Sequence, residues 1–187
     1  MKKRMAYAVS MLCVLAWLLC SNAIIASLSK AEPVRKIEFD EKWRKDVGCG
    51  WLDEIKMTNS ITGVVMVSGW AFVDAYEPNK NRYVSLILHG ENGCYEMRMV
   101  PPENTGGWLY LRNDVKAIYS DRLIPDGTPL GFVSEFSILN VKDGFYKVYI
   151  YCWENEKNYA LMEHEWWVEK HGVTMKMLDL PTDSSEQ

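Results

Sequence analysis

The chain has 187 residues, of which 48% are hydrophobic, 12% aromatic and 25% charged, a composition that excludes disorder as its overall state. All charges in the first 30 residues are positive, so residues 31–187 carry 17 basic against 25 acidic side chains, a net charge of −8. A surface of that sign repels phosphate backbones, and we therefore expect no nucleic-acid partner.

The first 30 residues are expected to direct the chain to a membrane, as a signal peptide or a signal-anchor transmembrane helix. Three cations at positions 2–4 precede residues 5–28, which contain no charge and are long enough to cross a bilayer as a helix. Because this stretch continues beyond the length of a signal-peptide core, we favour the uncleaved anchor. The alternative is cleavage at Ser21-Asn22-Ala23. Both place the rest of the chain outside the cytoplasm, membrane-anchored or secreted.

Three regions are expected after residue 30. Residues 31–48 are densely charged and are predicted to form a stalk or a short helix, residues 49–172 a β-sandwich domain, and residues 173–187 a frayed acidic tail. Hydrophobic residues in the domain alternate with period two, which is typical of strands. The predicted strands are residues 50–57, 63–73, 82–89, 94–100, 131–139, 145–153 and 159–170. A short helix over residues 115–119, capped by Asn113 or Asp114, is also predicted.

Seven short strands and one helical turn predict an all-β fold, an antiparallel β-sandwich. The alternation also predicts which side chains face its core. The residues expected to point inward from the third, fourth and sixth predicted strands are Val84, Leu86, Leu88, Tyr95, Met97, Met99, Tyr146, Val148, Ile150 and Cys152.

The sequence alone does not determine whether any of the cysteines are paired. Cys49, Cys94 and Cys152 follow the apolar segment, and an odd number leaves at least one free thiol in a monomer. A Cys94–Cys152 bridge with Trp108 between the two cysteines would be similar to an immunoglobulin disulfide. Because Trp108 follows two glycines and precedes a helical stretch, we expect buried free thiols instead.

A series of short motifs occurs in order between residues 50 and 153. These are Trp51-Leu52-Asp53, Val67-Ser68-Gly69-Trp70-Ala71, Leu111-Arg112-Asn113-Asp114-Val115 with Tyr119, Gly131-Phe132, Leu139, and Gly144 with Tyr146. Their order resembles a family of bacterial extracytoplasmic immunoglobulin-like domains. The resemblance implies an immunoglobulin-like sandwich and an accessory, non-catalytic role in envelope or polysaccharide-related proteins.

Six residues of these motifs are expected to be structural, namely Gly69, Trp70, Arg112, Asp114, Gly131 and Phe132. Gly69 permits close approach of a backbone or an indole, and Trp70 is expected to fill the core. Arg112 is expected to pair with Asp114 or to fasten its loop. Gly131 and Phe132 are expected to begin a strand with a core anchor.

Residue types that perform chemistry are scattered in this sequence. No zinc-binding cysteine pair, phosphate-binding loop or hydrolase motif occurs, and His164 lies between two glutamates that a strand would point to the opposite face. Asp53, Glu54, Asp74 and Glu77 are read as a solvated surface. We therefore expect no catalytic residues, no metal and no cofactor.

Aromatic residues form the most unusual pattern. Residues 145–153 place Tyr149, Tyr151 and Trp153 on one face of a strand whose other face already supplies core residues. This row is either the other interface of the sandwich, or is covered by the stalk or by side chains of the next strand such as Trp167, or contacts a protein or a sugar. These three residues are therefore the candidates for ligand contact.

The function expected from the sequence is that of a non-catalytic extracytoplasmic interaction module at the cell envelope, tethered to the membrane by its N-terminal helix or secreted. Its partner would be an envelope protein or a glycan. Two alternatives remain open. The first is a carbohydrate-binding module, and the second is an envelope enzyme whose carboxylates form no recognised site.

Overall fold

The computed structural model describes residues 10–14, 31–43, 48–73, 83–99, 109–122, 124 and 126–178. The chain divides into two units, Met1–Ala31 and Glu32–Gln187. In the first unit, residues 10–14 are helical. No helix among the described residues is long and apolar enough to cross a membrane. The rest of the expected signal anchor lies outside the described residues.

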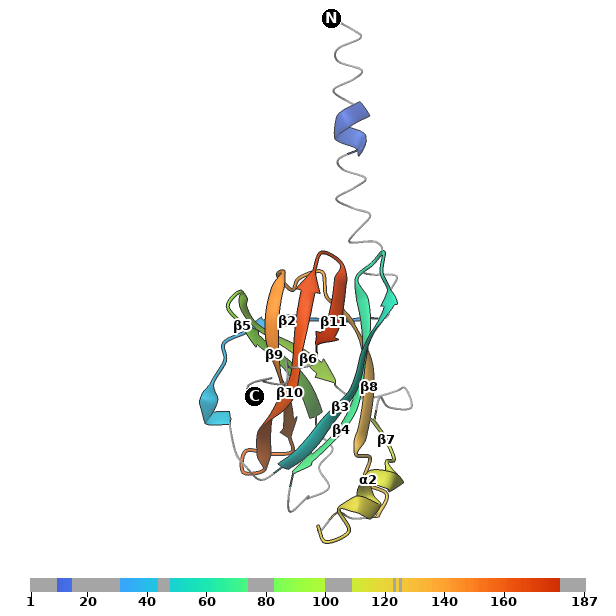
Figure 1. The fold of residues 1–187 in the computed structure, drawn as a ribbon, viewed down its shortest axis with the longest axis vertical. Helices are drawn as coiled ribbons and strands as arrows, with labels where there is room; N and C mark the ends of the chain where they lie inside the picture. Colours follow the sequence, from blue (N-terminus) through green and yellow to red (C-terminus); the bar gives the residue numbers. More distant parts are fainter. Residues whose placement is uncertain are drawn as a thin grey trace, which may run out of the picture. The chain divides into compact units, whose positions relative to one another are not determined.

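The second unit is built from two β-sheets (Figure 1). The first sheet has the strand order β1-β8-β4-β3, with β7 also paired to β8. Its strands are β1 (Glu32–Pro33), β3 (Gly48–Asn59), β4 (Val64–Val73), β7 (Leu109–Tyr110) and β8 (Gly131–Ser137). The second sheet has the order β11-β10-β9-β5-β6-β2. Its strands are β2 (Arg35–Ile37), β5 (Tyr83–Gly90), β6 (Gly93–Met99), β9 (Gly144–Trp153), β10 (Tyr159–His171) and β11 (Thr174–Leu178).

All seven predicted strands are present, and the expectation of an all-β fold with two sheets is confirmed. One hydrophobic core draws residues from both sheets, so the sheets pack face to face. The ten side chains predicted to point inward from β5, β6 and β9 are all buried in this core. Period-two alternation therefore identified the inner face of the second sheet correctly.

Gly69 lies in β4 at a crowded position. A Cβ atom at this position would lie 2.3 Å from the carbonyl oxygen of Trp51 and 2.6 Å from the ring of Phe132. Phe132 is fully buried between the sheets. The absence of a side chain at Gly69 therefore allows β3 and the Phe132 ring to approach β4 closely.

Trp70 does not lie in the main core, contrary to the expectation from the sequence. It is half-buried on the outer face of β4, where it packs with Phe72 and with residues of the α2 region. The ring centroid of Tyr119 lies 5.5 Å from that of Trp70 and 5.3 Å from that of Phe72. β4 is thus covered on both faces, but the outer cover is a small second cluster.

The short helix α2 (Asn113–Ile118) begins two residues earlier than predicted. Its N-terminal capping residue is Arg112, and no side chain caps the helix, so the prediction of a cap by Asn113 or Asp114 is wrong. Asp114 instead lies in the first turn, where it accepts hydrogen bonds from Arg112. Asn113 and Asp114 both lie inside the helix, so neither occupies the position from which a side chain caps the first turn.

The region expected to be a stalk belongs to the domain over its described part. β1 pairs parallel with β8 of the first sheet, and β2 pairs antiparallel with β6 of the second. Val34 between them is buried in the main core. A short 3-10 helix, η1 (Glu41–Trp43), follows. Residues 31–43 therefore join both sheets, because each sheet offers them an unpaired edge.

Part of the tail that was expected to be frayed is also ordered. Thr174–Leu178 forms β11, which pairs antiparallel with β10 after a turn at Gly172 (φ 56°). Met175 is buried in the main core. The local sequence is short and weakly alternating, and it becomes a strand because the edge of β10 provides backbone partners.

Candidate functional site

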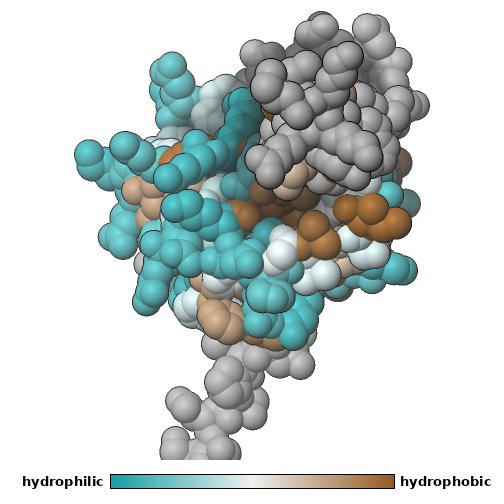
Figure 2. Space-filling model, turned by 90° about the horizontal axis from the view of Figure 1, so that it is seen from above, coloured by the Kyte–Doolittle hydropathy of each residue, from teal (hydrophilic) through white to brown (hydrophobic). Residues whose placement is uncertain are grey.

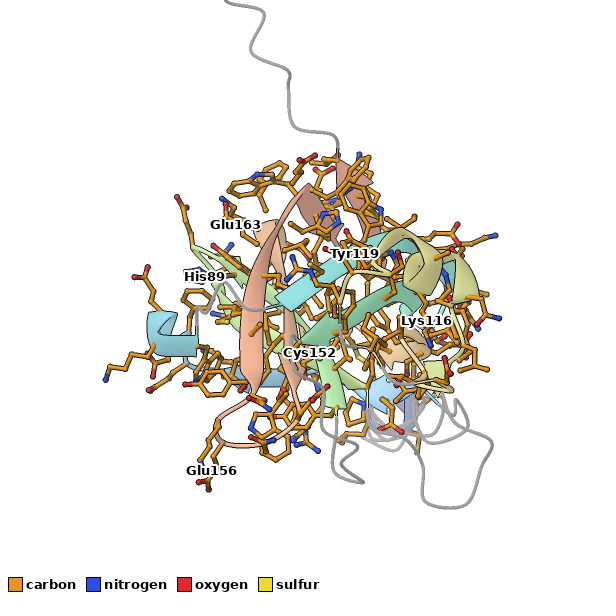
Figure 3. The ribbon with its side chains drawn as sticks, turned by 90° about the horizontal axis from the view of Figure 1, so that it is seen from below. His89, Lys116, Tyr119, Cys152, Glu156 and Glu163 are labelled. Carbon is orange, nitrogen blue, oxygen red and sulfur yellow. The ribbon has the colours of Figure 1, made fainter. Side chains whose placement is uncertain are left out.

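Side chains on the outer face of the second sheet form rows that cross several strands. His89 of β5 lies opposite Lys147 of β9, and Lys147 lies opposite Trp167 of β10. In the next row, Tyr149 of β9 lies opposite Glu163 of β10. Figure 3 shows His89 and Glu163 on this outer side, with Cys152 of β9 toward the middle of the domain.

A groove with a volume of about 600 Å³ opens over these rows. Its lining combines aromatic rings with polar side chains, of which the most relevant are His89, Asn92, Phe145, Lys147, Tyr149 and Trp167. Phe145 is 58% exposed, which is unusual for a phenylalanine in a sheet. The volume lies in the range of small-ligand pockets in proteins.

The polar side chains of the groove are held in place by pairing. Lys147 forms an ion pair with Glu163, and both side chains are partly exposed. Asn92, in the turn between β5 and β6, donates a hydrogen bond from Nδ2 to the carbonyl oxygen of Asp143 at 2.6 Å. Asp143 in turn accepts a hydrogen bond from the buried Lys170 at 2.9 Å. The wall of the groove near Asn92 is thereby fastened to the turn before β9.

Of the three predicted contact residues, only Tyr149 lines this groove. Tyr151 and Trp153 lie further along β9, and all three are half-buried on the outer face rather than between the sheets. Trp43 of η1 packs on Tyr151 with ring centroids 5.4 Å apart, and Tyr83 stacks on Trp153 at 5.3 Å. Burial and the neighbouring Tyr83 raise the pKa of Tyr151 above its ordinary value. Packing from within the domain thus covers this part of the row.

Phe39 forms the boundary between the covered and the open parts of the outer face. Its ring stacks on His89 at 4.1 Å and lies 5.2 Å from Tyr149. Phe39 and Trp43 also pack on a small cluster that contains Ile87 and Leu161. The segment before β3 therefore closes one half of this face and leaves the half near the β5–β6 turn open.

Figure 2 views the end of the domain that carries the β3–β4 and β10–β11 turns. Hydrophilic residues predominate in its coloured part, and hydrophobic residues form smaller patches between them. Ile61, in the β3–β4 turn, is 84% exposed. Isolated apolar side chains of this kind are common on protein surfaces and do not by themselves mark a site.

The Arg112 motif lies on the other sheet and forms an ion-pair network. Arg112 donates from Nε to Asp114 Oδ1 at 2.9 Å and from Nη1 to Asp53 Oδ2 at 2.7 Å. The guanidinium lowers the pKa of Asp114 to about 2. Gly131 lies against this network, since a Cβ there would lie 2.7 Å from the ring of Tyr110 and 2.9 Å from Arg112 Cγ. The network fastens α2 to β3.

His164 is the one histidine of the three with a buried side chain. Its Nε2 lies 3.1 Å from the amide nitrogen of Leu52, and its Nδ1 lies 3.2 Å from that of Trp166. A neutral imidazole accepts through one nitrogen only, so these amides compete for it, and an imidazolium could accept from neither. Burial lowers the pKa of His164 to about 4. Because β3 is an edge strand, His164 covers part of its open edge.

Cysteines take no part in a disulfide or a metal site in the described part of the chain. Cys13, Cys49, Cys94 and Cys152 form no disulfide, and no cluster of three potential metal ligands occurs among the described residues. Cys94 packs in the outer cluster and Cys152 in the main core, so the two thiols lie on opposite faces of one sheet. This geometry agrees with the prediction that they are not bridged.

Sequence reasoning named Trp167 of the next strand as a neighbour of the aromatic row, but it missed His89 and Asn92 as neighbours of Tyr149. The three come from β5, the β5–β6 turn and β10, and their proximity depends on the cross-strand register. A signal was present in Trp167, which lies on the same side of its strand as Tyr159 and Leu161. Comparisons of the chain with protein-family models, curated proteins and solved structures found no match.

Proposed function

We propose that this protein is a non-catalytic interaction module of the cell envelope, with an immunoglobulin-like domain that binds its partner in the groove over Phe145 and Trp167. The observation that carries this proposal is the groove itself, where exposed aromatic and polar side chains meet on an otherwise well-packed sheet. The carboxyl groups Asp114 and Asp143, whose pKa values are lowered, each serve an ion pair that fastens the fold. They are therefore assigned a structural rather than a catalytic role.

The strand order supports the immunoglobulin-like assignment. If β3, β4, β5, β6, β7, β8, β9 and β10 are called A, B, C, C′, D, E, F and G, the sheets read A-B-E-D and G-F-C-C′. Immunoglobulin domains have this division of strands between their sheets. Tyr146 near the start of β9 also donates from its hydroxyl to the carbonyl oxygen of Lys142 at 2.7 Å. This bond corresponds to the tyrosine corner at the start of strand F.

The extracytoplasmic location is supported by the basic start and the uncharged residues 5–28. We expect protease added to intact spheroplasts to remove an epitope fused after Gln187. A cytoplasmic marker protein in the same cells should stay intact until detergent is added. If the epitope stayed protected until the cells were lysed, the result would contradict the proposed topology.

A photo-crosslinking experiment tests the groove as the contact surface. Phe145 is replaced by benzoyl-phenylalanine in the full chain, and cells are irradiated and examined for adducts of lower gel mobility. We expect adducts because the ring at this position is 58% exposed inside the proposed site. Ile118, on α2 and 73% exposed, is the matched control position and should give none. Equal labelling from both positions, or none from Phe145, would contradict the proposal.

A further inference from the structure

We infer that the ligand of the groove is an uncharged carbohydrate chain, one of whose sugar rings stacks on Phe145 and Trp167. This inference rests on the proposed function, because it names the class of molecule that the interaction module binds. It moves the contact surface from the row Tyr149, Tyr151 and Trp153 to the open end of the outer face. Three features of the groove carry it.

The first feature is the arrangement of the aromatic rings. Trp167 lies opposite Lys147, and Phe145 lies two residues before Lys147 on the same face of β9. Phe145 and Trp167 are thus diagonal neighbours on adjacent strands, within reach of one ligand. The apolar C–H face of a pyranose packs on an aromatic ring while its hydroxyl groups point to the sides. A ring that is 58% exposed, such as that of Phe145, is available for this contact.

The second feature is the distribution of charge. The lysine in the lining, Lys147, is already paired with Glu163, so it offers an anionic ligand no unpaired cation. Glu91 also lines the groove and repels negative charge. His89 and the Oδ1 atom of Asn92 can form hydrogen bonds with a ligand at the margin, whereas Nδ2 of Asn92 already donates to Asp143. These groups suit hydroxyl groups better than phosphates, sulfates or carboxylates.

The third feature is that the groove has no open sheet edge. β5 lies between β6 and β9, β9 between β5 and β10, and β10 between β9 and β11. At the groove, Trp167 of β10 pairs with both β9 and β11, and β5 and β9 lie inside the sheet, so an extended peptide cannot add a strand there. An amphipathic helix would require a continuous apolar groove, and Lys147 and Glu91 interrupt this one. A ligand recognised through side chains alone fits the site better than either form of peptide.

The test uses the full chain in lipid nanodiscs, since detergents with sugar headgroups would compete. Calorimetric titration is performed with three neutral tetrasaccharides, namely cellotetraose, mannotetraose and tetra-N-acetylchitotetraose, and with tetragalacturonate as the acidic comparator. We expect at least one neutral sugar to bind, and Phe145→Ala and Trp167→Ala each to weaken it about tenfold. Phe145→Tyr keeps the ring and should keep binding, and Ile118→Ala should have no effect. Circular dichroism confirms that each variant is folded.

The possible outcomes separate the two proposals. Failure of all three neutral sugars, or preference for tetragalacturonate, overturns the carbohydrate assignment. If crosslinking from position 145 then yields a protein adduct, the interaction module stands with a different class of partner. If neither sugar binding nor crosslinking depends on position 145, both proposals fail. Sugar binding that survives both Phe145→Ala and Trp167→Ala would also reject this site.

Discussion

Phe132→Ala is expected to lower the free energy of unfolding by about 3–5 kcal/mol, the usual cost of removing a large aromatic side chain from a core. Phe132 has no exposed surface and lies between the sheets against Gly69. The cavity would open beside Gly69, where β4 pairs with both β3 and β8, and the backbone there cannot collapse into it without losing strand pairing. Since domains of this size are stable by about 5–15 kcal/mol, this is a large fraction of the total.

Phe145→Ala is the matched control for this prediction, because it makes the same chemical change on the surface. Phe145 is 58% exposed, so its loss should change the free energy of unfolding by no more than about 0.5 kcal/mol. Urea denaturation of the full chain, monitored by tryptophan fluorescence, measures the free energy of unfolding of both variants. Similar midpoints for Phe132→Ala and the unmodified protein would mean that the contact with Gly69 does not stabilise the sandwich.

Acidification is expected to destabilise the domain through His164. Burial holds the pKa of His164 at about 4 in the folded state, against about 6.5 in an unfolded chain. The unfolded state therefore binds a proton first as the pH falls, and stability that is present above pH 6.5 is lost toward pH 4. Between pH 7 and pH 5 this loss is about 2 kcal/mol, while ordinary carboxyl groups remain ionised.

Histidine variants separate this contribution from the others. His164→Gln should be less stable at pH 7, because the amide side chain fits the site less well, and its stability should vary less between pH 7 and pH 5. His171→Asn is the control, since His171 is 85% exposed, and it should keep the pH dependence of the unmodified protein. Denaturant unfolding curves recorded at several pH values measure the free energy of unfolding of each variant and test this prediction. If the free energy of unfolding of His164→Gln fell between pH 7 and pH 5 as much as that of the unmodified protein, the acid sensitivity would belong to another group.

Most of the sandwich was predictable because strand alternation is a local property. Tyr146, Val148, Ile150 and Cys152 are buried in the core as their spacing predicts, and so are the inward residues of β5 and β6. β1, β2 and β11 were not predictable in this way. They are two, three and five residues long, and they exist because longer strands offer them an edge. Trp70 was misplaced because alternation cannot say which of two apolar faces meets the other sheet.

The candidate site was predictable as a face of a strand but not as a position along it. Alternation placed Tyr149, Tyr151 and Trp153 on one side of β9, and the structure places them there. The cover over Tyr151 comes from Trp43, which is more than 100 residues away in the sequence. Trp167 reaches the groove through the register of β10 on β9, which shifts between Glu163 and Trp167. The face that Trp167 shares with Tyr159 and Leu161 was visible in the sequence, but the register that brings Trp167 to this end of β9 was not.

The thiols of the sandwich bear on how the protein can be produced. Cys152 lies in the core and Cys94 in the outer cluster, neither forms a disulfide, and burial raises the pKa of the Cys94 thiol to about 11. A fold whose described cysteines form no bridge draws no stability from an oxidant, and Cys94 reacts slowly as long as it stays protonated. The domain therefore has no need of thiol oxidases or disulfide isomerases. Strongly reducing buffers should leave it intact, which makes a reducing cytosol a suitable place for its recombinant production.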